Sequence, residues 1–175
     1  MNITFKKNII INFLLFIYCL TFLCSCSISR KGMIKEIKDY SLPIFLDKNQ
    51  NEALVYLVRP SPIGLVIPYK VFINNINDTN FEIGTNYPEN YLYFFVPSGK
   101  YIIYSKQPFS LNYEKIVIDV EAGKNYFIKQ TPIINFFIAS KHILKQIDEI
   151  EGKYHLKNTN IGKIKNFKFS FNKNL

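Results

Sequence analysis

Cysteine and histidine are scarce in this chain of 175 residues. Its three cysteines all precede residue 27, which excludes a disulfide-rich scaffold and a cysteine-based zinc site, and its two histidines exclude a histidine-rich metal site. Tryptophan is absent, but 16 Phe and 12 Tyr can fill a hydrophobic core. Seven Gly and eight Pro are too few for a low-complexity chain, and 48% hydrophobic residues exclude disorder throughout. The length suits one domain and a tail.

The chain begins with a short basic segment that is followed by a hydrophobic run. Lys6 and Lys7 precede an almost unbroken apolar stretch over residues 9–24. This arrangement is typical of a secretory signal peptide. The stretch is short for a transmembrane helix, which needs about 20 residues. The sequence therefore predicts a signal peptide over residues 1–25.

The end of this run resembles the lipobox of bacterial lipoproteins. In Leu23-Cys24-Ser25-Cys26, Leu23 stands three positions before Cys26 and the small Ser25 stands directly before it. The resemblance implies diacylglyceryl transfer to Cys26, cleavage before it and acylation of the new N-terminus. Several acyl chains together anchor a protein stably. Cys24 fits the pattern poorly because bulky Leu23 precedes it; the alternatives to lipidation are an uncleaved membrane helix and cleavage without lipid.

The predicted anchor has consequences for the location of the mature chain and for its net charge. Ser27 follows the acylated residue where Asp retains lipoproteins of enteric-type bacteria in the inner membrane, so the resemblance favours the outer membrane. Loss of Lys6 and Lys7 lowers the formal net charge from +9 to about +7. That excess suits anionic lipids or envelope polymers, and it is equally typical of a solvated lysine-rich surface. We expect no nucleic-acid partner for a lipid-anchored envelope protein.

The body of the chain predicts a mainly β fold. Residues 26–51 are expected to form a tether, with loose helical spacing over residues 33–40. From residue 52 the apolar period changes to two, and turn signals separate about eight short strands: 53–59, 69–73, 81–84, 91–96, 101–106, 115–120, 125–130 and 133–138. We therefore expect an antiparallel β-sandwich of seven or eight strands over residues 52–140, preceded by a signal helix.

Residues 141–175 are expected to form an arm and a basic tail. Ile143, Leu144, Ile147 and Ile150 have spacing that favours a short helix or irregular arm over residues 141–152, ended by Gly152. The tail alternates again over residues 164–171. It is consistent with an added edge strand guarded by lysines or with a basic, aromatic membrane-surface contact.

The order of these motifs resembles a family of bacterial lipoproteins and envelope proteins that is known only as a domain of unknown function. The shared pieces are an Ala-x-Val-Tyr-x-x-Arg-Pro strand starting at Ala53, a Pro-x-Gly-Lys turn at Pro97 and a Gly-x-x-Tyr-Phe strand at Gly123. The resemblance covers roughly residues 52–152 and implies a fold and a location, but no catalytic residues. The hairpins are also similar to small immunoglobulin- and transthyretin-type domains, although Asn74-Asn75 stands where such turns often carry Asp-Gly.

Arg59 is the residue of greatest interest in the body of the chain, because it ends an apolar strand directly before Pro60. Its guanidinium could clamp a carboxylate or phosphate of a ligand. It could instead find an internal acid or carbonyl and fix a loop, and its acidic candidates are Asp119, Glu121 and Glu82.

Enzymatic signatures are missing from the sequence. His142 and His155 have no nucleophile or metal ligand near them in a known catalytic spacing, and no Walker loop or dinucleotide fingerprint occurs. The acids at Asp148, Glu149 and Glu151 stand between lysines, as on a solvated face. We expect a non-enzymatic protein with no cofactor and no metal.

The predicted function is that of a lipid-anchored binding or scaffolding module. Loops on a rigid sheet scaffold commonly carry recognition, so loops 60–68 and 86–90 are the candidates, with Ile63 and Val66 as apolar contacts for an envelope protein. The alternative is a peptidoglycan- or glycan-binding module that uses exposed aromatics, for which Tyr87 and Tyr91 are candidates.

Overall fold

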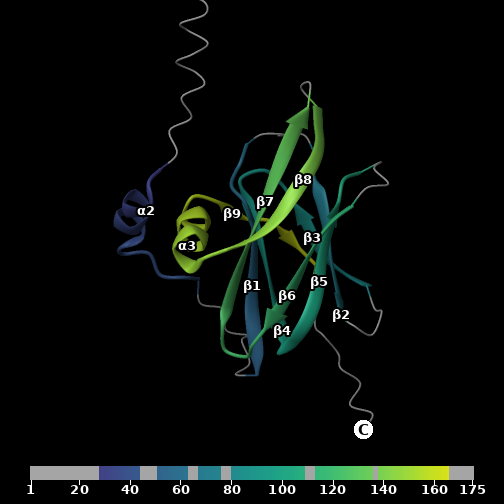
Figure 1. Cartoon of the computed structure of the whole chain (residues 1–175), viewed down its shortest axis with the longest axis horizontal. Helices are drawn as coiled ribbons and strands as arrows, with labels where there is room; N and C mark the ends of the chain where they lie inside the picture. The colour runs from purple at the N-terminus through teal and green to yellow at the C-terminus, as the bar shows by residue number, and fades with distance from the viewer. Residues whose placement is uncertain are drawn as a thin grey trace, which may run out of the picture.

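The computed structural model describes residues 28–43, 51–62, 67–75, 80–108, 113–135 and 138–165. The elements run in the order α2 (Arg30–Ile37), β1 (Glu52–Arg59), β2 (Tyr69–Asn75), β3 (Asn80–Asn86), β4 (Asn90–Pro97), β5 (Gly99–Lys106), β6 (Tyr113–Val120), β7 (Asn125–Asn135), β8 (Ile138–Ile147), α3 (Glu149–Lys157), β9 (Asn160–Ile161) and β10 (Lys163–Ile164). Figure 1 shows the strands gathered in two layers, with both helices on one side. The predicted mainly β fold is confirmed.

The strands form two five-stranded sheets. Sheet A has the order β8-β7-β1-β4-β9, and sheet B has the order β10-β3-β2-β5-β6. The expectation of wholly antiparallel pairing was wrong for sheet A, because β1 runs parallel to β7 and β4 runs parallel to β9. Alternation shows which face a residue takes but gives no strand direction, so the sequence could not reveal this. The likeness to immunoglobulin or transthyretin domains stays a prediction.

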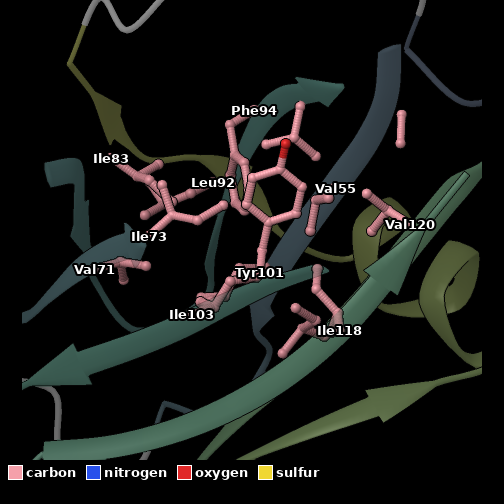
Figure 2. Packing of buried hydrophobic residues seen from close by; sticks show 14 of the residues in the cluster. Val55, Val71, Ile73, Ile83, Leu92, Phe94, Tyr101, Ile103, Ile118 and Val120 are labelled. Atoms are coloured by element: carbon pink, nitrogen blue, oxygen red, sulfur yellow. The ribbon is translucent and has the colours of Figure 1, made fainter. Parts of the chain in front are cut away.

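The main hydrophobic core lies between the two sheets. Sheet A contributes the inward positions of β1 and β4, including Val55, Leu57 and Phe94, and sheet B contributes those of β2 and β5, including Ile73 and Ile103. Figure 2 shows labelled members of this core, among them Val55, Ile73 and Ile103, gathered between the two layers. Their burial follows the period-two pattern that the sequence shows.

The outer face of sheet A is also covered, which produces a second hydrophobic cluster. Leu54, Tyr56 and Val58 of β1 pack there with Phe127 and Leu156, the last of which belongs to α3. All seven residues of β1 after Glu52 are therefore buried. Tyr40 and Leu42, which follow α2, pack against the same cluster, so the expected tether includes a segment that contacts the domain.

The expected helix or arm over residues 141–152 was wrong over its first half. Residues 141–147 belong to β8, and the expected boundary at residue 140 falls inside that strand. Leu144 lies in the core between the sheets, whereas Ile147 lies in the cluster under α3. The helix begins at Glu149, after Asp148 caps it by accepting a hydrogen bond from the Glu151 N–H at 3.0 Å.

Helix α2 packs against α3 and lies farther from the sheets than α3 does (Figure 1). Arg30 forms an ion pair with Asp148 at 2.7 Å. At the other end, Lys157 Nζ donates to the Glu36 carbonyl at 2.7 Å, and Asn158 Nδ2 donates to the Glu36 carboxylate at 3.1 Å. Polar contacts at both ends thus fix the direction of α2 on the domain.

Gly152 lets α3 approach sheet A closely. A Cβ at this position would lie 2.3 Å from Cγ of Phe127. Gly→Ala in a helix interior normally stabilises by about 1 kcal/mol, but overpacking costs about 1–3 kcal/mol. We expect Gly152→Ala to lower the free energy of unfolding by about 2 kcal/mol in urea titrations.

Gly32→Ala in α2 is the matched control for this substitution. There the Cβ would meet Cγ1 of Ile28 at 2.9 Å, which is a longer contact than at Gly152 and involves no core ring. We expect the control to keep the ordinary helical gain of Gly→Ala, up to about 1 kcal/mol, and not to lower the free energy of unfolding. A Gly152→Ala protein more stable than wild type would contradict the close packing of α3 on Phe127.

The C-terminal strands connect the two sheets at one side of the molecule. β9 pairs with β4 of sheet A, and β10 then pairs with β3 of sheet B. Gly84 permits this crossing, because a Cβ there would lie 2.3 Å from the Lys163 carbonyl oxygen. Of the predicted edge strand over residues 164–171, Ile164 belongs to β10, and Lys165 follows that strand with its N–H donating to the Ile83 carbonyl at 2.9 Å. Residues 166–171 lie outside the described residues, as does the membrane-contact alternative for the tail.

Within the described part of the chain, neither helix has the length and apolar character needed to cross a membrane.

Candidate functional site

One end of the sandwich has a polar interior. Six side chains that point between the sheets are buried there: Arg59, Tyr69, Asn86, Ser105, Gln130 and His142. They come from three strands of each sheet, β1, β7 and β8 in sheet A and β2, β3 and β5 in sheet B. We call this set the polar end. It lies where β1 ends and β2 begins, beside loop 60–68.

Arg59 joins two loops at this end. Its Nη1 donates to the carbonyl of Ile67 at 2.7 Å and to the carbonyl of Asn86 at 3.4 Å. Its guanidinium carbon lies 4.4 Å from the centre of the Tyr69 ring, within the range of a cation–π contact. Ile67 belongs to loop 60–68 and Asn86 begins loop 86–90, so one buried cation holds the backbone of both.

A directed chain of hydrogen bonds crosses the polar end. Asn86 Nδ2 donates to Gln130 Oε1 at 3.0 Å, and Gln130 Nε2 donates to Ser105 Oγ at 2.9 Å. Ser105 Oγ in turn is hydrogen-bonded to Nε2 of His142. Because Ser105 already accepts from Gln130, its hydroxyl proton can be donated to a neutral His142. Each of these three hydrogen bonds joins sheet B to sheet A, which fixes the two layers relative to each other.

His142 is held in its neutral form. Burial, followed by the charge of nearby Arg59, lowers the pKa of His142 from 6.5 to about 4, and a hydrogen bond with the Ser105 backbone opposes this shift. The imidazole also lies 4.3 Å from the Tyr69 ring, centroid to centroid. An uncharged ring at neutral pH avoids a second buried cation next to Arg59.

Ser105 and His142 have the atoms of a nucleophile–base pair, but their surroundings favour a structural role. Both are almost completely buried, with exposed fractions of 0% and 5%. Among the described contacts, none brings a carboxylate to His142 to orient its ring. Nucleophilic catalysis needs a reachable oxygen and an oriented base. The hydrogen bond between Ser105 and His142 therefore holds the two sheets together at the end that carries loops 60–68 and 86–90.

Two of the residues expected to contact a partner lie in the interior. Arg59 is 0% exposed, and it takes the internal alternative with carbonyl oxygens. Tyr91 is 4% exposed and packs in the cluster outside sheet A, where its ring lies 6.2 Å from that of Tyr56. Neither side chain is therefore available as a contact surface. Tyr87 is half-buried in loop 86–90.

The other predicted site residues lie outside the described residues. They are Ile63 and Val66 in loop 60–68, and the lipobox residues Leu23, Ser25 and Cys26.

Sequence reasoning missed most of the polar end, although a signal was present. Ser105 is in phase with the buried Tyr101 and Ile103, and Gln130 is in phase with Ile128. His142 precedes Leu144 in the same way. A polar residue at an inward position of several strands, each time near one end, indicates a shared buried network.

The outer face of sheet B carries a different feature, an aromatic row. The rings of Phe72 and Tyr104 stack at 5.3 Å and 15°, and Tyr104 lies 6.0 Å from Tyr113, which is 60% exposed. Lys70, Lys106 and Lys115 stand at neighbouring register positions and are exposed. This row gives the outer face of sheet B a basic and aromatic character.

The chain is similar to a protein family and to a bacterial protein that are both described without a function. A family model described as "Protein of unknown function (DUF2846)" matches residues 49–144, which includes β1 to most of β8. A protein of Haemophilus influenzae described only as uncharacterized is 29% identical over 117 residues. That alignment covers 67% of this chain and 65% of the relative's length.

Proposed function

The chain belongs to the DUF2846 family of proteins of unknown function, and the family description therefore assigns it no role. From the residues of the chain itself, we propose that it is a lipid-anchored, non-enzymatic module that binds or scaffolds an envelope protein. Acyl chains on Cys26 hold it at the periplasmic face of a membrane, the outer membrane in preference to the inner. The lipobox of Leu23, Ser25 and Cys26 supports the anchor.

The observation that carries the binding role is the position of Arg59. Its contacts with the carbonyls of Ile67 and Asn86 join the described end of loop 60–68 to the start of loop 86–90 at the polar end. A surface held in advance loses little conformational entropy on binding, so it binds more tightly than a mobile one. Ile63 and Val66 give the first loop the apolar character that suits a protein partner.

Crosslinking in living cells tests this proposal on the tagged full-length protein. A photo-crosslinking phenylalanine derivative replaces Pro62, which is exposed, or Tyr87, which is half-buried and aromatic. We expect one dominant protein adduct from both positions, and its loss in a protein that also carries Ile63→Asp and Val66→Asp. The same mass spectra report whether the N-terminal peptide begins at an acylated Cys26.

Lys100 is the matched control position, since it is exposed and follows the β4–β5 turn at the opposite end of the sandwich. The derivative placed there should give no such adduct. Capture that persists in a folded Ile63→Asp/Val66→Asp protein would contradict loop-end binding. An unmodified peptide that begins at Met1 would contradict the lipid anchor.

A glycan-binding role is the second candidate, and the aromatic row favours it. Tyrosines on the outer face of a sheet can stack on sugar rings, and Tyr104 and Tyr113 lie on such a face. In the same crosslinking experiment, co-purified glycan with no protein adduct would select this function. Retention on cell-wall sacculi that Tyr113→Ala abolishes would assign the glycan to the row.

A further inference from the structure

Helix α2 has a charged outer face that none of the contacts described above uses. Lys31, Ile34, Lys35 and Lys38 follow the spacing i, i+3, i+4, i+7 and are all exposed, with Ile34 at 48%. Met33, Glu36 and Ile37 lie on the other side and are partly buried. One face of the helix thus packs against α3, and the other presents three lysines around one aliphatic side chain. We call this second face the basic face.

The acidic side chains nearest the basic face, with one exception, form hydrogen bonds or ion pairs with residues outside this face. The Glu36 carboxylate accepts from Asn158, Asp148 pairs with Arg30, and Glu149 pairs with Lys153. Asp39 is the exposed acid in this segment. Among the described residues, no ion pair joins Lys31, Lys35 or Lys38 to a carboxylate. The face is therefore complementary to an anionic surface.

The distance along the chain limits what that surface can be. Cys26 precedes Arg30 by four positions, so α2 begins within roughly 14 Å of the residue that would carry the acyl chains. The helix itself is about 12 Å long, and its two ends are fixed on α3 by the contacts of Arg30 and Glu36. A bilayer that holds Cys26 is thus within reach of the whole helix.

We propose that the basic face of α2 lies on anionic phospholipid headgroups of the membrane in which the protein is anchored. This inference rests on the proposed function, because it requires the lipid on Cys26. Lysines near an anionic bilayer gain electrostatic energy, and an aliphatic side chain at the centre of such a face enters the interfacial region. The docking of α2 on α3 then sets the orientation of the whole domain on the membrane.

A label on Ile34 tests the proposal in the acylated full-length protein. The residues after the predicted cleavage site contain Cys26 alone as a cysteine, so an introduced cysteine is the sole free thiol once Cys26 is acylated. Ile34→Cys and the control Val117→Cys, which is 49% exposed on β6, each carry an environment-sensitive fluorophore. The proteins are reconstituted in vesicles of phosphatidylglycerol with phosphatidylethanolamine, or in phosphatidylcholine alone.

We expect the Ile34 label to be protected from an aqueous quencher in the phosphatidylglycerol vesicles and exposed in phosphatidylcholine, while the Val117 label stays exposed in both. Adding Lys31→Gln, Lys35→Gln and Lys38→Gln should lower the ratio of docked to undocked helix by about 100-fold, since each lysine near the surface contributes about fivefold. High salt should reduce protection in the same direction.

Three results would overturn the inference. Equal quenching of both labels in all vesicles, with an acylated Cys26 peptide in the mass spectrum, would reject the basic face while leaving the proposed function intact. If the Ile34 label is protected in native membranes but in none of the pure-lipid vesicles, the basic face contacts a protein instead of lipid headgroups. An unacylated Cys26 would remove the anchor and reject both proposals together.

Discussion

Arg59→Ala is expected to lower the free energy of unfolding by about 4 kcal/mol. The substitution removes a side chain that is 0% exposed, leaves the carbonyls of Ile67 and Asn86 without this donor, and opens a cavity against the Tyr69 ring. Urea unfolding followed by circular dichroism measures the loss. Partner capture should fall as well, because loops 60–68 and 86–90 lose the cation that joins them.

Two comparison variants separate the causes of this loss. Arg59→Met keeps most of the aliphatic volume, so its expected loss of about 2 kcal/mol reports the hydrogen bonds and the cation. Lys100→Ala removes an exposed cation and should stay within about 0.5 kcal/mol of wild type. An Arg59→Ala protein within 1 kcal/mol of wild type would show that the loops do not depend on Arg59.

The sequence was sufficient to predict the strands, because period-two alternation and turn residues are local signals. β4 and β5, with the Pro97 turn between them, lie within one or two residues of the expected ranges. Sheet pairing was not predictable in the same way. The parallel pairing of β1 with β7 joins segments that are some 70 residues apart, and no local pattern specifies such a contact.

The region around β8 shows why the expected helix was wrong. Ile143, Leu144 and Ile147 satisfy a helical period, but in the strand their side chains lie in three different environments. Leu144 faces the core, Ile147 lies under α3, and Ile143 is 46% exposed. A strand with one face partly covered by a helix loses clean alternation, so periodicity alone could not distinguish the two.

The candidate site was predictable only where a residue was unusual in its sequence context. Arg59 is unusual because it ends an apolar strand, and the structure places it at the centre of the polar end. Ser105, Gln130 and His142 are ordinary residues in ordinary strands, and only the packing of the two sheets brings them together. The tetrad that ends at Cys26 is a linear pattern, so its resemblance to a lipobox depends on the sequence alone, and lipidation of Cys26 stays a prediction.

His142 should make the protein lose stability in mild acid. Burial and the charge of Arg59 lower its native pKa to about 4, whereas an unfolded chain has an ordinary histidine of pKa 6.5. Between these values the unfolded state binds a proton that the native state does not, so the free energy of unfolding falls as pH falls. The stabilisation is complete above pH 6.5 and is lost on the way down to pH 4, by about 3 kcal/mol in total.

Urea titrations from pH 7.5 to pH 4.5 measure this slope, and His142→Gln should flatten it whatever the variant does to stability at pH 7. His155 contributes in the same direction, because burial and the charge of Lys129 lower its pKa as well. A His142→Gln/His155→Gln protein shows the part of the pH dependence that comes from neither histidine. Carboxylates with lowered pKa values, such as Asp148 beside the Glu151 N–H and Arg30, lose their contribution to stability only below about pH 4.

A wild-type slope equal to that of His142→Gln, or a His142 ring that titrates near 6.5 by NMR, would show that the polar end is open to water. Because the same end supports both loops, that result would also remove the rigid support on which the proposed binding surface depends.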